Sequence, residues 1–203
     1  MDKLYFSVAG VPASAPKPET LSGLTRIKEL GLDGMELEFV NGVKMQEKKA
    51  QEVKDLAQLL NLVLTAHAPY YVNLNAQEPQ KLENSKRHIL QTAKIAFLAG
   101  AVSFTFHPAF YLKQDPYFVY QTVLTHIKDL QQEIKDLGYN ILISPETTGK
   151  PTAFGTLSEL LQLVKDTSDL NICVDFAHLH ARSNGGYNSY AEFSQVLQDI
   201  KNT

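Results

Sequence analysis

The chain has little of several things that mark particular protein classes. Its 203 residues contain one cysteine, Cys173, and no tryptophan, so no disulfide can form within the chain. No apolar run approaches the roughly 20 residues that cross a bilayer, and Pro12 interrupts the N-terminal stretch too early for a signal peptide. We therefore expect a cytoplasmic protein without membrane contact, in which Cys173 packs as a small apolar residue.

Further absences bear on catalysis. No glycine-rich phosphate loop follows a strand-like run, and no Gly-x-Ser-x-Gly nucleophile elbow is present. The net charge is −3, so the chain lacks the basic balance typical of nucleic-acid binders, although local basic patches stay open. The apolar share of 44% is ordinary for a globular domain. Nucleotide-binding and serine-hydrolase chemistry are therefore disfavoured.

What is present is a regular alternation of strand-like and helical runs. The strand-like runs are residues 4–8, 34–39, 62–66, 102–106, 140–144 and 171–175. Helical patterns cover about 19–30, 43–60, 79–99, 116–137, 156–166 and 189–201. Gly31, Gly100 and Gly138 follow three of these helices as C-cap glycines, and Asp115-Pro116 begins a fourth. The alternation predicts a parallel sheet in a single α/β domain over residues 1–203.

The two faces of the expected strands differ in character. One face is apolar, as with Leu64, Phe104 and Ile143, whereas the other is small or polar. Central strands of an open doubly wound sheet are apolar on both faces, so this asymmetry favours a (β/α)8-type TIM barrel. In the second strand Glu36 and Glu38 then point inward, which is costly unless they are paired, hydrated or bound to a cation.

Four strand ends carry side chains that bind metals. They are His67 in LTAHAPY, His107 in FTFHPAF, Glu146 in ISPETTGK, and both Asp175 and His178 in CVDFAH. Each alone has a plainer reading, such as a hydrogen-bonded loop histidine or a capping carboxylate. In a barrel, however, the carboxyl ends of the strands converge. Imidazoles with carboxylates suit Zn²⁺, Mn²⁺, Co²⁺ or Fe²⁺ better than Mg²⁺, so we expect a transition-metal site.

At these residues the sequence resembles the endonuclease IV family, the metal-dependent branch of the apurinic/apyrimidinic endonucleases among the xylose-isomerase-like TIM barrels. The residues of these segments are most similar to those of archaeal homologues of that family. The resemblance covers nearly the whole chain and is densest at ELGLDGMELEFV, TAHAPYYVNL, FHPAFY, SPETTGKPTAFGTLSEL and CVDFAHLHAR.

The resemblance implies a role for each strand-end residue. His67 and His107 would bind a first metal, Glu146 would bridge two metals as the catalytic carboxylate, Asp175 would bind a second metal and His178 a third. The family's remaining ligands, a histidine, an Asp-x-His pair and a glutamate, come from later strands. This chain ends at Thr203 after about six βα units, whereas a complete barrel takes about 250 residues. We therefore expect an incomplete barrel without its C-terminal third, whose open edges pair with a second copy or a partner chain.

The implied activity is zinc-dependent hydrolysis of DNA phosphodiesters at abasic sites, as part of DNA repair. Further substrate contacts are expected from Tyr70, where the family places a tyrosine that meets DNA, and from Lys150, Glu36, Glu38, His180 and Arg182. The last four could equally form a solvated rim. A divalent-metal sugar isomerase or epimerase of the same superfamily is the alternative, with Glu36 and Glu38 in acid/base roles. A third alternative is that the chain is an inactive fragment that needs a partner chain.

Overall fold

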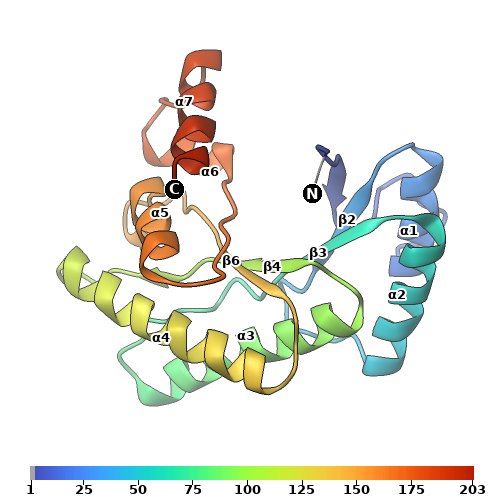
Figure 1. Cartoon of the computed structure of the whole chain (residues 1–203), viewed down its shortest axis with the longest axis horizontal. Coiled ribbons are helices and arrows are strands. Elements are labelled where there is room, and N and C mark those ends of the chain that lie inside the picture. Colours follow the sequence, from blue (N-terminus) through green and yellow to red (C-terminus); the bar gives the residue numbers. More distant parts are fainter. Residues whose placement is uncertain (1–2) are drawn as a thin grey trace. The chain divides into compact units, whose positions relative to one another are not determined.

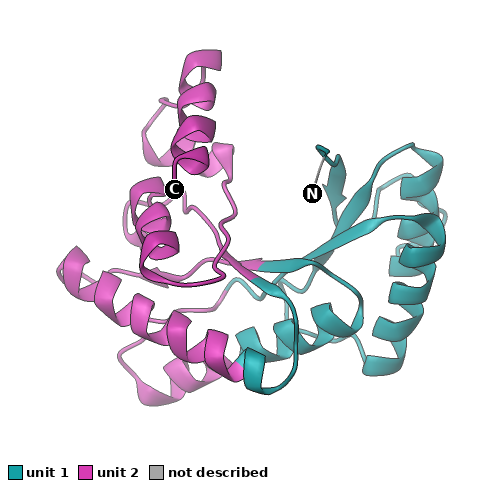
Figure 2. Ribbon diagram, viewed as in Figure 1, with its two compact units in different colours: residues 1–70, 88–104, 134–142 teal, residues 71–87, 105–133, 143–203 magenta. Residues whose placement is uncertain are grey.

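The computed structural model describes residues 3–203, which divide into two compact units (Figure 2). Unit 1 takes the chain up to Tyr70, then His88–Phe104 and Ile134–Leu142. Unit 2 takes Tyr71–Arg87, Thr105–Glu133 and Ile143–Thr203. The expectation of a single domain over residues 1–203 stays a prediction.

Strands and helices alternate along the chain (Figure 1). The strands of the main sheet are β1 (Ser7–Ala9), β2 (Gly34–Glu38), β3 (Val63–His67), β4 (Ser103–Phe106) and β6 (Leu142–Pro145), and they follow one another in chain order. The helices are α1 (Thr20–Glu29), α2 (Glu47–Leu60), α3 (Pro79–Leu98), α4 (Pro116–Asp136), α5 (Leu157–Asp166), α6 (Phe176–Arg182) and α7 (Tyr190–Lys201). Neighbouring strands in chain order with helices between them are the arrangement of a TIM barrel, as predicted.

Unit 1 is built on three parallel strands. Gly34 of β2 aligns with Ser7 of β1 and with Val63 of β3. The β2 side chains Met35 and Leu37 are buried, and the helix α1 packs against both β2 and α2. The predicted apolar face of these strands is therefore confirmed for β2, where it is covered by helix.

The first strand is shorter than predicted. The expected run 4–8 is replaced by β1 at Ser7–Ala9, and Leu4 and Phe6 are 75% and 63% exposed. The backbone before β1 is held instead by Asp33, whose carboxylate accepts a hydrogen bond from Phe6 N at 2.9 Å. The Asp33 backbone N–H also donates to the Phe6 carbonyl at 2.7 Å, so this backbone is paired although it lies outside β1.

Unit 2 differs from the sequence prediction in three short elements. The expected strand at 171–175 is reduced to two isolated parallel bridges, Ile143 with Leu170 and Glu146 with Cys173. No helix was predicted between residues 175 and 189, yet α6 lies there. A pair of two-residue antiparallel strands, β5 (Ala109–Phe110) and β7 (Ala153–Phe154), was not predicted. None of these elements is long enough to show a hydrophobic period.

Helix ends match the sequence signals more closely. Gly31, Gly100 and Gly138 all have positive φ, and the Asp115 carboxylate accepts hydrogen bonds from the backbone N–H of Tyr117 and Phe118. The exception is α2, which begins at Glu47 rather than near residue 43. Among residues 3–203, no helix combines the length and hydropathy that a bilayer crossing requires.

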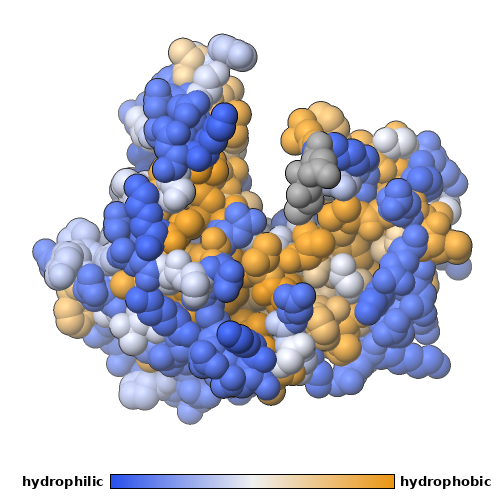
Figure 3. Space-filling view, in the orientation of Figure 1, coloured by the Kyte–Doolittle hydropathy of each residue, from blue (hydrophilic) through white to orange (hydrophobic). Residues whose placement is uncertain are grey.

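The core of unit 2 gathers under β6 and the β5/β7 pair. Phe106, Phe154 and Leu160 are fully buried, and the Phe154 ring lies near those of Tyr111 and Tyr120. The helix α7 is amphipathic: in Figure 3 the segment that carries it is hydrophilic on one side and apolar along the other. On α7, Phe193 packs edge-on against Phe176 of α6.

Candidate metal centre

Glu146 lies directly after β6, at the position where a barrel strand presents functional side chains. Its backbone N–H donates to the carbonyl of Phe106 at 3.0 Å, and its backbone bridges Cys173 on the other side. The residue is only 5% exposed. A carboxylate is thus carried into the interior by main-chain pairing on both sides.

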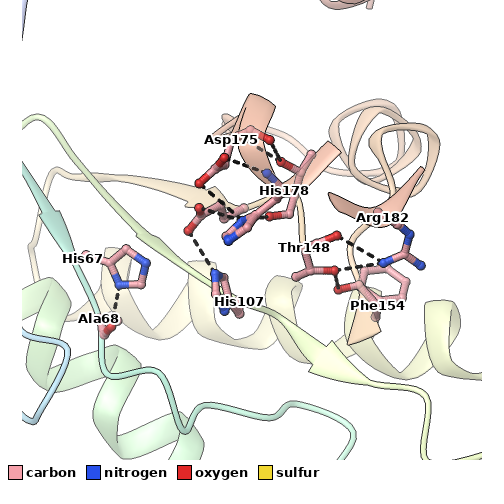
Figure 4. A network of polar contacts seen from close by, with 10 residues as sticks. His67, Ala68, His107, Thr148, Phe154, Asp175, His178 and Arg182 are labelled. Atoms are coloured by element: carbon pink, nitrogen blue, oxygen red, sulfur yellow. Dashed lines mark hydrogen bonds and ion pairs between the residues drawn. The ribbon is translucent and has the colours of Figure 1, made fainter. Parts of the chain in front are cut away.

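Two imidazoles flank this carboxylate. His107 Nε2 lies 3.4 Å from Glu146 Oε2, and His178 Nδ1 lies 3.3 Å from Glu146 Oε1. The two rings meet edge to face, with their centroids 5.2 Å apart (Figure 4). Residues from three separate segments, after β4, after β6 and in α6, therefore meet at one point of unit 2.

Asp175 is tied to the same point through the start of α6. It is the N-cap residue, and its Oδ1 accepts a hydrogen bond from the backbone N–H of His178 at 2.8 Å. Its Oδ2 lies 3.5 Å from His178 Nδ1, and its own backbone N–H donates to Thr147 Oγ1 at 2.9 Å. The predicted Asp-x-x-His spacing is therefore a helix cap that holds both side chains together.

The hydrogen bonds of His178 define its tautomer. Nδ1 lies 2.8 Å from the carbonyl oxygen of Thr147, which can only accept, so Nδ1 carries the proton and donates it. In the neutral ring Nε2 then holds the lone pair, as in the histidines that bind metals through Nε2 while Nδ1–H bonds a backbone carbonyl. Glu146, Asp175 and His178 each offer one ligand atom, and these atoms lie within 4.8 Å of one another. This group could hold a metal ion.

His67 belongs to unit 1, where it ends β3 and is buried. Its Nδ1 lies 2.6 Å from the carbonyl of Ala68, so it has the same tautomer as His178. The exposed ring of Tyr70 stands edge-on to it at 5.0 Å. That His67 shares a cation with the unit 2 residues, and that Tyr70 meets DNA, stay predictions.

Glu36 and Glu38 lie in unit 1 and line a pocket of about 440 Å³. Glu38 is exposed, whereas Glu36 is half-buried. The same pocket is lined by Lys44 and Lys49, so acidic and basic side chains share it.

The remaining predicted contacts lie in unit 2. Lys150 is exposed, His180 Nδ1 donates to the carbonyl of Gly186 at 2.8 Å, and Arg182 donates to the loop after β6. The structure thus gives His180 and Arg182 partners within the chain. Substrate contact by these three residues stays a prediction.

Sequence reasoning missed Thr147 and the support around Glu159. Thr147 is fully buried and holds both Asp175 and His178. Thr156 and Glu159 form a capping box that starts α5, a signal readable as T-x-x-E in the sequence. Glu159 also accepts from the Tyr111 hydroxyl at 2.8 Å, and burial together with this bond raises the pKa of Tyr111 to about 12.

The chain is similar in sequence to other proteins. It is 40% identical over 201 residues to the uncharacterized protein MJ0133 of Methanocaldococcus jannaschii, covering 98% of this chain and 71% of that one. It is 26% identical over 146 residues to an endonuclease 4 homolog of Dictyostelium discoideum, covering 70% of this chain but 26% of that protein.

Two solved structures share the fold. Endonuclease IV from Thermus thermophilus matches 96% of this chain and 71% of its own, with a TM-score of 0.73 and 21% identity. A D-psicose 3-epimerase matches 98% of this chain and 82% of its own, with a TM-score of 0.75 and 15% identity. Residues 24–202 match the profile described as xylose isomerase-like TIM barrel, and the chain belongs to that family.

Proposed function

We propose that this protein is a metal-dependent phosphodiester hydrolase of the endonuclease IV type, acting at abasic sites in DNA. The observation that carries the proposal is the buried Glu146 carboxylate, which lies 3.4 Å from His107 Nε2 and 3.3 Å from His178 Nδ1. Burying an ionised carboxylate is unfavourable unless positive charge or hydrogen bonds compensate it. A divalent cation would provide that compensation.

The donor set fits a transition metal. Imidazole nitrogens with carboxylate oxygens suit Zn²⁺, with Mn²⁺, Co²⁺ and Fe²⁺ as alternatives. Glu146, Asp175 and His178 would hold one ion between them. His107 and His67 are proposed as ligands of a further ion, which Glu146 would bridge. When bound, such an ion lowers the pKa of a water molecule and neutralises charge on phosphoryl oxygens.

The chain's own residues would do the positioning. The Thr147 carbonyl holds the proton on His178 Nδ1 and so keeps the Nε2 lone pair available. The Asp175 cap fixes the start of the helix that carries His178. Lys150, exposed on the loop after Glu146, is proposed to meet a DNA phosphate as a point charge. Sequence similarity to endonuclease 4 homologs supports DNA as the substrate over part of the chain.

The test is cleavage of an end-labelled duplex that contains one tetrahydrofuran abasic analogue. This analogue cannot undergo β-elimination, so a cut reports hydrolysis. We expect cutting with added Zn²⁺ or Mn²⁺, none with EDTA, and loss of cutting in Glu146→Gln, which keeps the shape of the side chain but removes its charge. A Zn²⁺-loaded wild-type protein that leaves the duplex intact would contradict the proposal.

A matched control is Glu133→Gln. Glu133 is an exposed glutamate of α4 in the same unit, so its substitution removes one negative charge without touching the centre. We expect it to cut at the wild-type rate. Equal loss in both variants would point to a general charge effect rather than to a role of Glu146.

One observation favours a second candidate, a sugar epimerase. The pocket of about 440 Å³ in unit 1 is of small-ligand size and carries Glu36 and Glu38, residues suited to moving a proton on a sugar. Exchange of deuterium from D₂O into a keto-sugar, lost in Glu36→Gln, together with intact abasic DNA, would favour this candidate. Neither activity in a folded protein would favour a chain that needs a partner.

A further inference from the structure

Arg182, the last residue of α6, is engaged with the loop after Glu146 (Figure 4). Its Nη1, which carries two hydrogens, lies 2.9 Å from the carbonyl oxygens of both Lys150 and Ala153 and 3.1 Å from the Thr148 hydroxyl, which share these donors. It also lies 3.3 Å from the Thr148 carbonyl, and Nη2 lies 3.4 Å from the Tyr111 hydroxyl. One guanidinium therefore satisfies several acceptors of a single turn of backbone.

The same helix holds the preceding peptide through His178. His178 and Arg182 are four residues apart, so they lie on one face of α6, one turn from each other. His178 donates to the carbonyl of Thr147, and Arg182 donates to that of Thr148. Two successive peptide groups of the loop are thus bound by two side chains of one short helix.

The loop also packs tightly on α6 at Gly149. A Cβ added there would lie 3.2 Å from His178 Cδ2 and 3.4 Å from His178 Cα. The first of these distances is tighter than an ordinary van der Waals contact and the second is at its edge, so the backbone approaches the helix closely at this glycine. Hydrogen bonds on either side of Gly149 therefore define where the loop lies on α6.

We propose that Arg182 is a positioning residue for the candidate metal centre: by holding the 148–153 backbone on α6, it keeps the Thr147 carbonyl on His178 Nδ1 and thereby sets the His178 tautomer. The inference rests on the proposed metal site for its consequence in metal affinity. In this proposal Arg182 contacts the protein's own loop, in place of the substrate contact that the sequence predicted for it.

The physical reason lies in the difference between the two side chains that donate to the loop, the Arg182 guanidinium and the His178 imidazole. An arginine side chain is charged at every accessible pH and presents several N–H groups in a fixed plane, so it can satisfy several carbonyls at once. A neutral imidazole can place its single proton on either nitrogen, so its tautomer depends on an acceptor staying in place. If the loop shifts away, Nδ1 loses its nearest acceptor, the Thr147 carbonyl at 2.8 Å, and keeps only the more distant carboxylate oxygens of Glu146 at 3.3 Å and Asp175 at 3.5 Å.

The first measurement uses the metal-free protein and so does not depend on any activity. Long-range ¹H–¹⁵N spectra report which ring nitrogen of each histidine carries the proton. In wild type we expect neutral His178 to be the Nδ1–H tautomer. In Arg182→Gln we expect a mixture of tautomers for His178, while His180, which bonds Gly186, keeps its signal.

The second measurement is the affinity for Co²⁺ followed by its visible absorption. Loss of an outer-shell partner lowers metal affinity by roughly 10–100-fold, and we expect a loss in this range together with an altered Co²⁺ spectrum in Arg182→Gln. Arg182→Lys should lie between wild type and Arg182→Gln, because it keeps the positive charge but loses the planar group that reaches both this backbone and the Tyr111 hydroxyl. It also serves as the test should Arg182→Gln fail to fold.

The control is Arg87→Gln, which removes an exposed arginine of α3 in the same unit. It should leave both the tautomer and the affinity unchanged. A folded Arg182→Gln or Arg182→Lys with the wild-type His178 tautomer would overturn the proposal, even if its melting temperature fell. Wild-type protein that binds no Co²⁺ would instead remove the proposed function, and the tautomer result would still decide the role of Arg182.

Discussion

The ends of β2 and β6 both carry glutamates, yet the chain treats them differently. Glu38, at the end of β2, is exposed and lines an open pocket with lysines. Glu146, just after β6, is 5% exposed and flanked by two imidazoles. The same residue type at the same kind of place in a βα unit is a solvated group in one case and a candidate metal ligand in the other.

The difference comes from the segment after each strand. After β2, residues 39–46 form no regular element before α2. After β6, the loop is folded back through the β5/β7 pair, held by Arg182, and continued into α5 by a capping box. Backbone that is pinned on both sides of a charged side chain can keep it buried, whereas the segment after β2, although hydrogen-bonded at Phe39 and Val40, leaves Glu38 in water.

The largest effect on stability is expected from removing the packing beneath the loop that follows β6. Phe154 of β7 is fully buried, so Phe154→Ala should lower the free energy of unfolding by about 3–5 kcal/mol. Phe118→Ala, at a side chain that is 57% exposed, should change it by no more than about 0.5 kcal/mol. Urea unfolding followed by circular dichroism measures both. Equal small effects would mean that the β5/β7 pair does not support the loop.

The two glutamates can be compared directly by cation titration. Glu146→Gln should weaken Zn²⁺ binding by at least about 100-fold, the upper range for loss of an outer-shell partner, because a ligand itself is lost. Glu38→Gln, in the open pocket, should leave this affinity unchanged. Competition with a chromophoric chelator gives both constants. If Glu38→Gln has the larger effect, the centre lies in the other pocket.

Alanine substitutions at Gly149 and Gly138 test whether the position of the loop on α6 affects metal binding. Gly149→Ala places a Cβ 3.2 Å from the His178 ring, so we expect the loop to shift and Zn²⁺ affinity to fall by roughly 10-fold. Gly138→Ala meets no atom within 4 Å but sits at φ +76°, so it should cost about 1 kcal/mol of stability without changing metal binding. The reverse pattern would argue against close packing of the loop on α6.

The smallest expected effect concerns a histidine away from the centre. Burial lowers the pKa of His126, nearby Lys86 lowers it further, and Asp129 at 3.8 Å opposes both. The unfolded chain therefore takes up this proton first, so stability should be full above about pH 6.5 and fall as pH drops through the folded pKa. His126→Gln should flatten this slope in unfolding curves measured against pH. An unchanged slope would mean that other groups cause it.

The sequence predicted much of the frame. Capping glycines such as Gly138 and the N-cap at Asp115 are local signals, and they placed most helix ends within a few residues. The strand-end positions of His107, Glu146, Asp175 and His178 followed from the same alternation, and unit 2 does bring these four together. The wrong predictions concern short elements. The first strand was predicted too long, the expected strand at 171–175 is two isolated bridges, and α6 was not predicted.

By itself, then, the order of residues determined which side chains stand at strand ends and where most helices stop, because those signals act over a few neighbouring positions. Only the tertiary structure decided that Glu146 is buried, that His178 carries its proton on Nδ1, and that Arg182 holds the loop. The physical reason is distance along the chain. Arg182 finds its acceptors in the loop 29 to 34 residues away, and Thr147 finds His178 31 residues away, so no local pattern can encode these bonds.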